Sequence, residues 1–166
     1  MGVVMKLIDA ILFAFFLVIA IAAPLVDAQT CLPTNVFPDI LVHLKTWYTH
    51  EYGDYLVSEK PHFFVGLIWV ELLFAWPLSV ASLYGIVAAK SWLNTTCLLY
   101  GVSTLTAMVA ILSELVGSGK ASVKLLKMYC PFLGFAVLAI MRGLLPRSGK
   151  ANTTSSRPML VRKKRA

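Results

Sequence analysis

The chain of 166 residues is long enough for one domain or a small bundle, and 58% of it is hydrophobic whereas only 14% is charged. Soluble domains carry roughly 45–50% apolar and about 25% charged residues, so the composition argues against a soluble enzyme and against disorder. The net charge of +7 belongs to one end, because eight basic residues and no acidic one lie between Arg142 and Ala166. The preceding 141 residues have a net charge of −1, which removes the support for a nucleic-acid partner.

Four apolar runs have the length of a membrane-spanning segment, at residues 10–26, 63–89, 92–116 and 125–145. A bilayer core about 30 Å thick requires about 20 apolar residues in a helix. Helices are the suitable spanning element here, because lipid offers the backbone no hydrogen-bond partners and a helix supplies its own. The sequence therefore predicts an all-α fold, a four-helix transmembrane bundle. We expect a membrane domain over residues 1–145, with helices at about 7–27, 63–89, 92–116 and 125–145, and a basic cytosolic tail over 146–166.

The first apolar run has a second interpretation. Lys6, the apolar stretch and Val26-Asp27-Ala28 together match a secretory signal peptide with small residues at its cleavage site. In that case residues 1–28 would be removed, whereas in the other case they form the first membrane helix. Both alternatives place the following residues in the lumen.

The positive-inside rule sets the orientation. With both termini in the cytosol, ten basic residues are cytosolic and five, at positions 45, 60, 120, 124 and 127, are lumenal or interfacial. The loop over 28–61 is then lumenal. Within it, residues 40–52 place apolar side chains at i, i+3 and i+4 spacing, which predicts an amphipathic helix. This helix either forms an interfacial aromatic belt or caps the helix bundle.

A few acidic residues among the apolar ones are the main candidates for function. Glu71 lies inside the second apolar run without a basic neighbour, so it faces a cavity or a partner, or is protonated. Pro77 follows six residues later and predicts a kink that can open space between helices. Asp27 at the end of the first helix and Asp54 in the loop are each also explained as solvated acids.

Enzyme and metal motifs are mostly missing. The three cysteines, Cys31, Cys97 and Cys130, are too far apart in the sequence to form a C-x-x-C motif. The three histidines lie in the loop or at its end. We therefore expect no metal, no cofactor and no catalytic residue. Lys163 and Lys164, fourth and third from the end, match a dilysine retrieval signal of the endoplasmic reticulum. The alternative for them is a basic tail attracted to anionic lipids.

The chain resembles the sigma-2 receptor family, an EXPERA group related to the emopamil-binding sterol isomerases. The residues that carry the resemblance are Val26-Asp27-Ala28-Gln29, Leu32-Pro33, Trp47-Tyr48, Asp54, and Glu71-Leu72-Leu73-Phe74 with Pro77. It implies a four-helix protein of the endoplasmic reticulum membrane, a homodimer that acts in cholesterol handling. It also implies a pocket between the helices that opens toward the bilayer and binds sterols or cationic amphiphilic amines.

The resemblance assigns roles to individual residues. Asp27 matches the acid that pairs with a ligand amine, Glu71 an acid hydrogen-bonded to it, and Asp54 a third acid near the pocket. The ligand-binding residues that we predict are Asp27, Glu71, Asp54, Trp47, Tyr48, Tyr100, Thr106, Tyr129 and Phe132. Ala75 and Ala107 replace a Gln and a Thr of the family, which removes two polar groups near the pocket. A need for Asp27 in the pocket favours an uncleaved first helix.

Three hypotheses follow. The first is a non-enzymatic membrane protein that binds a sterol, a cationic amphiphile or another membrane lipid. The second is a sterol Δ8–Δ7 isomerase, which requires a proton donor and a base near two carbons, but no predicted span contains a histidine. The third is a trafficking chaperone that binds a membrane-protein client.

Overall fold

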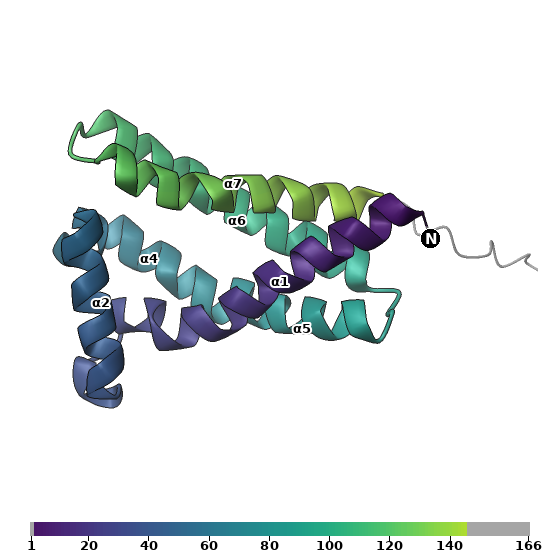
Figure 1. Ribbon diagram of the computed structural model, residues 1–166, viewed down its shortest axis with the longest axis horizontal. Coiled ribbons are helices and arrows are strands. Elements are labelled where there is room, and N and C mark those ends of the chain that lie inside the picture. Colours follow the sequence, from purple (N-terminus) through teal and green to yellow (C-terminus); the bar gives the residue numbers. More distant parts are fainter. Residues whose placement is uncertain (1, 146–166) are drawn as a thin grey trace, which may run out of the picture.

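The computed structural model describes residues 2–145, and all regular elements in that range are helical (Figure 1). The longer elements are α1 (Val3–Leu25), α2 (Asp39–Tyr52), α4 (His62–Val70), α5 (Trp76–Val87), α6 (Leu93–Gly117) and α7 (Val123–Leu144). The shorter ones are the 3-10 turns η1 (Asp27–Thr30) and η2 (Thr34–Val36), the helix α3 (Tyr55–Glu59) and the π-helical turn η3 (Glu71–Ala75). The predicted tail, with Lys163 and Lys164, lies outside the described residues.

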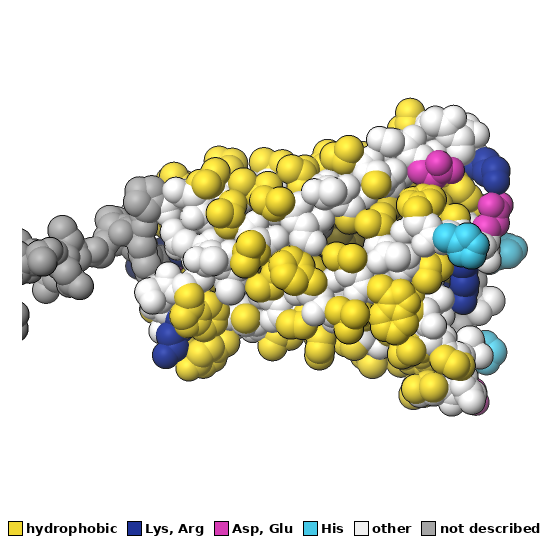
Figure 2. Space-filling view, turned by 180° about the vertical axis from the view of Figure 1, so that it is seen from behind, with side chains coloured by type: hydrophobic (Ala, Val, Ile, Leu, Met, Phe, Trp, Pro, Cys, Tyr) yellow, Lys and Arg dark blue, Asp and Glu magenta, His cyan; other side chains and the backbone are white. Residues whose placement is uncertain are grey.

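Within these residues four stretches are long and apolar enough to cross a membrane, namely Val3–Thr30, His62–Val87, Leu93–Gly117 and Val123–Leu144. The predicted all-α architecture with four transmembrane helices is thereby confirmed. Figure 2 shows hydrophobic side chains along the flank of the bundle, while charged and histidine side chains gather at the end where α2 lies. This distribution suits a bundle whose sides face hydrocarbon and whose α2 end faces water.

Small residues allow the last two long helices to approach closely. α6 and α7 lie side by side along their lengths, and α1 packs against α5 and α7 (Figure 1). A Cβ atom added at Gly101 of α6 would lie 2.8 Å from the carbonyl oxygen of Ala136, and one at Gly143 of α7 would lie 2.7 Å from Cβ of Leu98. Such contacts between small residues and a neighbouring backbone are typical of helix pairs in membranes.

The second membrane-length stretch is not one continuous α-helix. The backbone N–H of Trp76 donates to the carbonyl of Glu71, five residues earlier, so residues 71–75 form a single π-turn between α4 and α5. The sequence predicts a kink at Pro77, and the structure shows the interruption in the turn that directly precedes this proline, which lies in the first turn of α5. Proline has no backbone N–H to donate to the preceding turn. The wider hydrogen-bonding pattern of a π-turn accommodates this missing bond.

A buried ion pair joins three helices at the end of the bundle opposite α2. The guanidinium of Arg142 on α7 donates to the carboxylate of Asp9 on α1, and its Nη1 also donates to Oδ1 of Asn94 at 2.8 Å. Arg142 is 1% exposed and Asp9 is 8% exposed. Arg142 therefore belongs to the bundle, and its charge is neutralised inside it rather than added to the basic tail.

The connection between α1 and α4 is largely helical. The amphipathic helix predicted at residues 40–52 is confirmed as α2, which runs crosswise at the end of the long helices (Figure 1). Gln29 of η1 donates from Nε2 to the carbonyl of Leu41 at 3.2 Å and so links α2 to the end of α1. Gly53 ends α2 in the left-handed region at φ 63°, where glycine carries no Cβ penalty. The chain then turns directly into α3.

Candidate ligand-binding cavity

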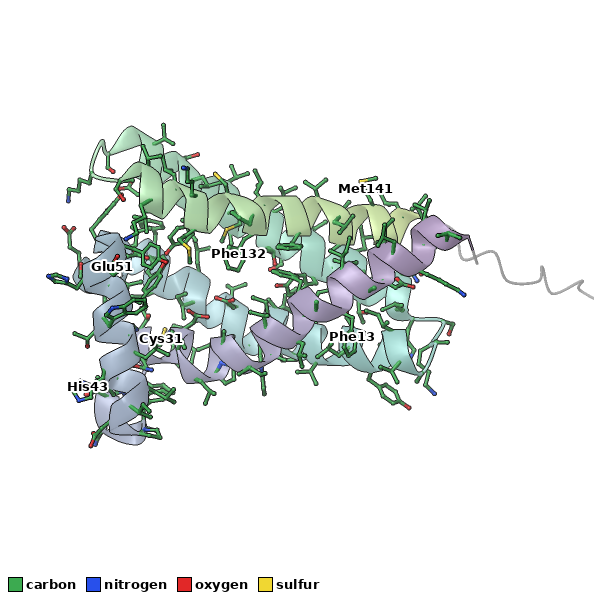
Figure 3. All side chains as sticks on the ribbon, viewed as in Figure 1. Phe13, Cys31, His43, Glu51, Phe132 and Met141 are labelled. Carbon is green, nitrogen blue, oxygen red and sulfur yellow. The ribbon has the colours of Figure 1, made fainter. Side chains whose placement is uncertain are left out.

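A cavity of about 240 Å³ lies between the long helices at the α2 end of the bundle. The membrane-length stretches and α2 all contribute side chains to its wall. Most of these side chains are aliphatic, aromatic or methionine, and six carry polar groups suited to bind a ligand: Asp27, Thr30, Lys45, Tyr48, Glu71 and Tyr129. Tyr129 and Phe132 of α7 complete the wall, and Phe132 points from α7 toward α1 (Figure 3). Apolar walls with a few polar groups are typical of small-molecule sites.

Asp27 and Glu71 reach the cavity from two different helices. Asp27 is the first residue of η1, directly after α1, and Glu71 begins the π-turn η3. Both carboxyl groups line the cavity and are close enough to interact electrostatically. The family resemblance implies a hydrogen bond between them. Among the described residues, however, neither side chain has a hydrogen-bond partner, because both point into the cavity. Two facing acids in an apolar cavity do not ionise together easily, so they favour a shared proton or a polar ligand.

Lys45 is a polar wall residue that sequence reasoning missed. It lies on α2, lines the cavity, and donates from Nζ to Oγ1 of the buried Thr30 at 2.8 Å. Burial and, next, the charge of Lys60 lower the pKa of Lys45 to about 8, against the opposing effect of Asp27. Its position had a sequence signal, since Leu41, Lys45 and Tyr48 recur at i, i+4 and i+7 on one face of α2.

Asp54 does not line the cavity but holds two tyrosines that do. It is fully buried, and its Oδ2 accepts hydrogen bonds from the hydroxyls of Tyr129 at 2.8 Å and Tyr48 at 3.2 Å. Its Oδ1 accepts from the backbone N–H groups of Leu56 and Val57 and caps α3. Burial and then the neighbouring Asp54 raise the pKa of Tyr48 above its ordinary value, so this tyrosine remains a hydrogen-bond donor. Asp54 is therefore a positioning residue and not a solvated loop acid.

A second cavity of about 50 Å³ adjoins the first, with Glu71, Phe132 and Met108 in both walls. Tyr100, predicted as a wall residue, lines this smaller cavity together with Thr104. Ala75 and Ala107, which depart from the family pattern, also line it. The two alanines therefore remove polar groups from the wall itself.

Besides Asp54, two of the predicted ligand-binding residues, Thr106 and Trp47, are absent from the walls of both cavities. Thr106 is on the exposed side of α6, where its hydroxyl donates to the carbonyl of Val102 at 3.0 Å. At 100° per residue it lies about 120° around the helix from Tyr100, whereas Thr104 lies about 40° away and faces the cavity. Trp47 is 58% exposed, because it follows Lys45 by two residues and so points to a different side of α2. Its neighbour Tyr48 is the aromatic residue that lines the wall.

The described side chains offer no obvious metal site, since no group of three His, Cys, Asp or Glu residues in 2–145 is arranged to hold an ion. His43, His50 and His62 are exposed and absent from the walls of both cavities. His43 points outward from α2 (Figure 3). The cavity thus brings carboxyl, hydroxyl and ammonium groups together around an apolar chamber.

The fold and the cavity define a class, a four-helix membrane protein with a small-molecule chamber between its helices. Comparison with known families agrees with this class, because residues 40–143 match the family described as EXPERA (EXPanded EBP superfamily). The match covers more than half of the chain, and the chain belongs to this family.

Curated relatives carry the name Sigma intracellular receptor 2. The chain is 32% identical over 88 residues to the proteins of Macaca fascicularis and Homo sapiens, an alignment that covers 52% of this chain and 50% of each relative. It is 24% identical over 154 residues to the protein of Xenopus tropicalis, covering 85% of this chain and 90% of that relative. The chain thus spans about half the length of the first two relatives and most of the third.

Proposed function

We propose that the chain is a non-enzymatic receptor-type protein of the endoplasmic reticulum membrane that binds a sterol or a cationic amphiphile in the cavity and serves lipid homeostasis. The observation that carries this proposal is the pair Asp27 and Glu71, two carboxyl groups without hydrogen-bond partners among the described residues, which face an apolar chamber. A carboxyl group buried in a membrane segment without a hydrogen-bond partner costs several kcal/mol, and a polar ligand group lowers that cost.

The shape of the chamber also supports a ligand with an apolar body. Its wall combines the acids at one place with Phe64, Ile68, Ile111 and Phe132 around the remaining space. A polar head placed at the acids leaves the body of the ligand against these side chains, where burial contributes about 25 cal/mol for each Å² of apolar surface. The adjoining smaller cavity extends the chamber beyond Glu71.

Binding to the full chain in lipid nanodiscs tests this function. Radiolabelled cholesterol and a radiolabelled tertiary-amine amphiphile should each be tested for saturable binding above empty nanodiscs. We expect saturable binding of at least one probe, and a loss of about tenfold or more in its affinity for Asp27→Asn and Glu71→Gln. Glu114→Gln, which removes an acid outside both cavities, is the matched control. Saturable binding with unchanged affinity in both variants would contradict the site.

A product assay separates receptor from enzyme. The family includes sterol isomerases by resemblance, and the cavity carries carboxyl and hydroxyl groups that are able to exchange protons. Incubation of the purified protein with a Δ8 sterol, followed by mass spectrometry and chromatography, should return the sterol unchanged. Formation of the Δ7 isomer that Glu71→Gln abolishes would replace the receptor function by catalysis.

A further inference from the structure

Lys45 places a cation in the same chamber as the two acids. Its side chain enters from α2, outside the membrane-length helices, and lines the cavity with Asp27 and Glu71. A lysine at a membrane boundary commonly extends its ammonium to water. Here the ammonium instead donates to Thr30, whose own exposure is 6%, so it is directed inward.

The electrostatic surroundings show which charges act on this ammonium. Asp27, Asp54 and Cys31 favour its charged form, whereas burial and Lys60 disfavour it. Asp54 already accepts four hydrogen bonds from Tyr48, Tyr129 and two backbone N–H groups. Of the two acids that act on Lys45, Asp27 is therefore the one that is free to balance its charge.

The charges of the chamber consequently come close to cancelling. Asp27 and Glu71 together hold about one negative charge when they share a proton. The ammonium of Lys45 supplies one positive charge in the wall of the same chamber. A ligand with a permanent ammonium group then meets no net opposite charge, and it must compete with Lys45 for Asp27 at a site where charges are weakly screened.

We propose that Lys45 is the resident cation of the chamber and makes the site selective for an uncharged amphiphile with a hydroxyl head, a sterol-like alcohol, over a cationic amphiphile. A hydroxyl group donates to a carboxylate and accepts from an ammonium at the same time, so it bridges Asp27 and Lys45. A cationic ammonium group accepts no hydrogen bond, so it pairs with the acid by charge and is repelled by the lysine. This inference rests on the proposed function and decides between the two ligand classes named there.

A pair of probes that share one apolar chain tests the selectivity. Radiolabelled 1-dodecanol and dodecyltrimethylammonium differ in the head group, and empty nanodiscs correct for partition into lipid. For the wild-type chain we expect the alcohol to bind more tightly. Lys45→Met should raise the affinity for dodecyltrimethylammonium about tenfold and change that for 1-dodecanol by less than about threefold, because a positive charge in the wall of the same cavity is removed.

Two further variants control this experiment. Lys127→Met removes an exposed cation of α7 that is absent from the walls of both cavities and does not act on Lys45, and it should leave both affinities unchanged. Lys45→Arg keeps the charge and should keep the wild-type preference. The inference would be overturned if the probes bind saturably and the wild-type chain binds the ammonium probe more tightly. It would also be overturned if the ratio of the two affinities is the same in Lys45→Met as in the wild type. Either result would leave the proposed function standing. Failure of every probe, cholesterol included, to bind saturably would overturn both.

Discussion

The hydroxyl of Tyr129 donates a 2.8 Å hydrogen bond to Asp54, which ties the wall of the cavity on α7 to the cap of α3. This hydrogen bond holds in place two side chains that are 75 positions apart in the sequence. Tyr48 of α2 donates to the same carboxylate oxygen, so one buried acid holds three elements in register around the chamber. The stability of this end of the bundle should depend on Asp54 more than on the tyrosines.

Variants of this junction should show a graded loss of stability. Tyr129→Phe removes one hydrogen bond to a charged group and should lower the free energy of unfolding by about 1–2 kcal/mol. Asp54→Ala removes the helix cap and the acceptor of both tyrosines, and should cost about 3 kcal/mol or more. Unfolding of the purified protein in detergent measures the losses. Tyr84→Phe, at an exposed tyrosine of α5, is the control, and an equal effect of all three variants would contradict the role of Asp54.

Apolar run length sufficed to predict the four membrane helices, because lipid leaves the backbone few alternatives. The same argument singled out Glu71, since an acid inside an apolar run needs a reason to be there. Lys45 was not predicted as a wall residue because it lies outside the four apolar runs, where a lysine needs no special explanation. Only the packing of α2 against η1 shows that its ammonium turns inward to Thr30.

The partners of Arg142 were equally hidden, because Asp9 is 133 residues away and each residue alone resembles the solvated end of a helix. Charge counting assigned Arg142 to the tail for this reason. Thr106 shows the opposite error, in which proximity to Tyr100 in sequence was a poorer guide than the helical angle between them. Tertiary pairing and side-chain direction were the missing information in these cases.

The ion pair of Arg142 and Asp9 should be worth more to stability than any exposed pair. Arg142→Met leaves Asp9 buried without its cation, and breaking a buried pair costs about 3–5 kcal/mol. The double variant Asp9→Leu with Arg142→Met should recover a large part of that loss, because no unpaired charge remains. A double-mutant cycle on unfolding in detergent measures both effects. The exposed pair Lys120 and Glu59 is the control, and its loss should cost about 1 kcal/mol or less.

Binding of a permanent cation should strengthen as Lys45 loses its proton. Burial and Lys60 lower the pKa of Lys45 to about 8, so its positive charge is present below that pH and is lost above it. The affinity for dodecyltrimethylammonium, which does not titrate, should therefore rise between pH 7 and pH 9 in the wild-type chain.

The acids of the chamber also change with pH, so the comparison with Lys45→Met carries the prediction. The ionisable groups around residue 45 are the same in both proteins, namely Asp27, Asp54, Cys31 and Lys60. Only the wild-type chain has, in addition, the titrating amine of Lys45. The tenfold advantage of the variant should shrink toward equality as the pH passes about 8. An advantage that is constant from pH 7 to pH 9 would show that Lys45 does not act through its charge.

Residence in the endoplasmic reticulum should depend on two lysines of the tail, outside the described residues. If the two lysines are the predicted retrieval signal, Lys163→Ala with Lys164→Ala should move the tagged full chain toward later secretory compartments, because signals of this kind are read by a receptor. Arg162→Ala with Arg165→Ala removes the same charge and keeps both lysines, so it should leave the distribution unchanged. An equal shift for both pairs, measured by fluorescence microscopy, would favour attraction of the tail to anionic lipids at about 1 kcal/mol per charge.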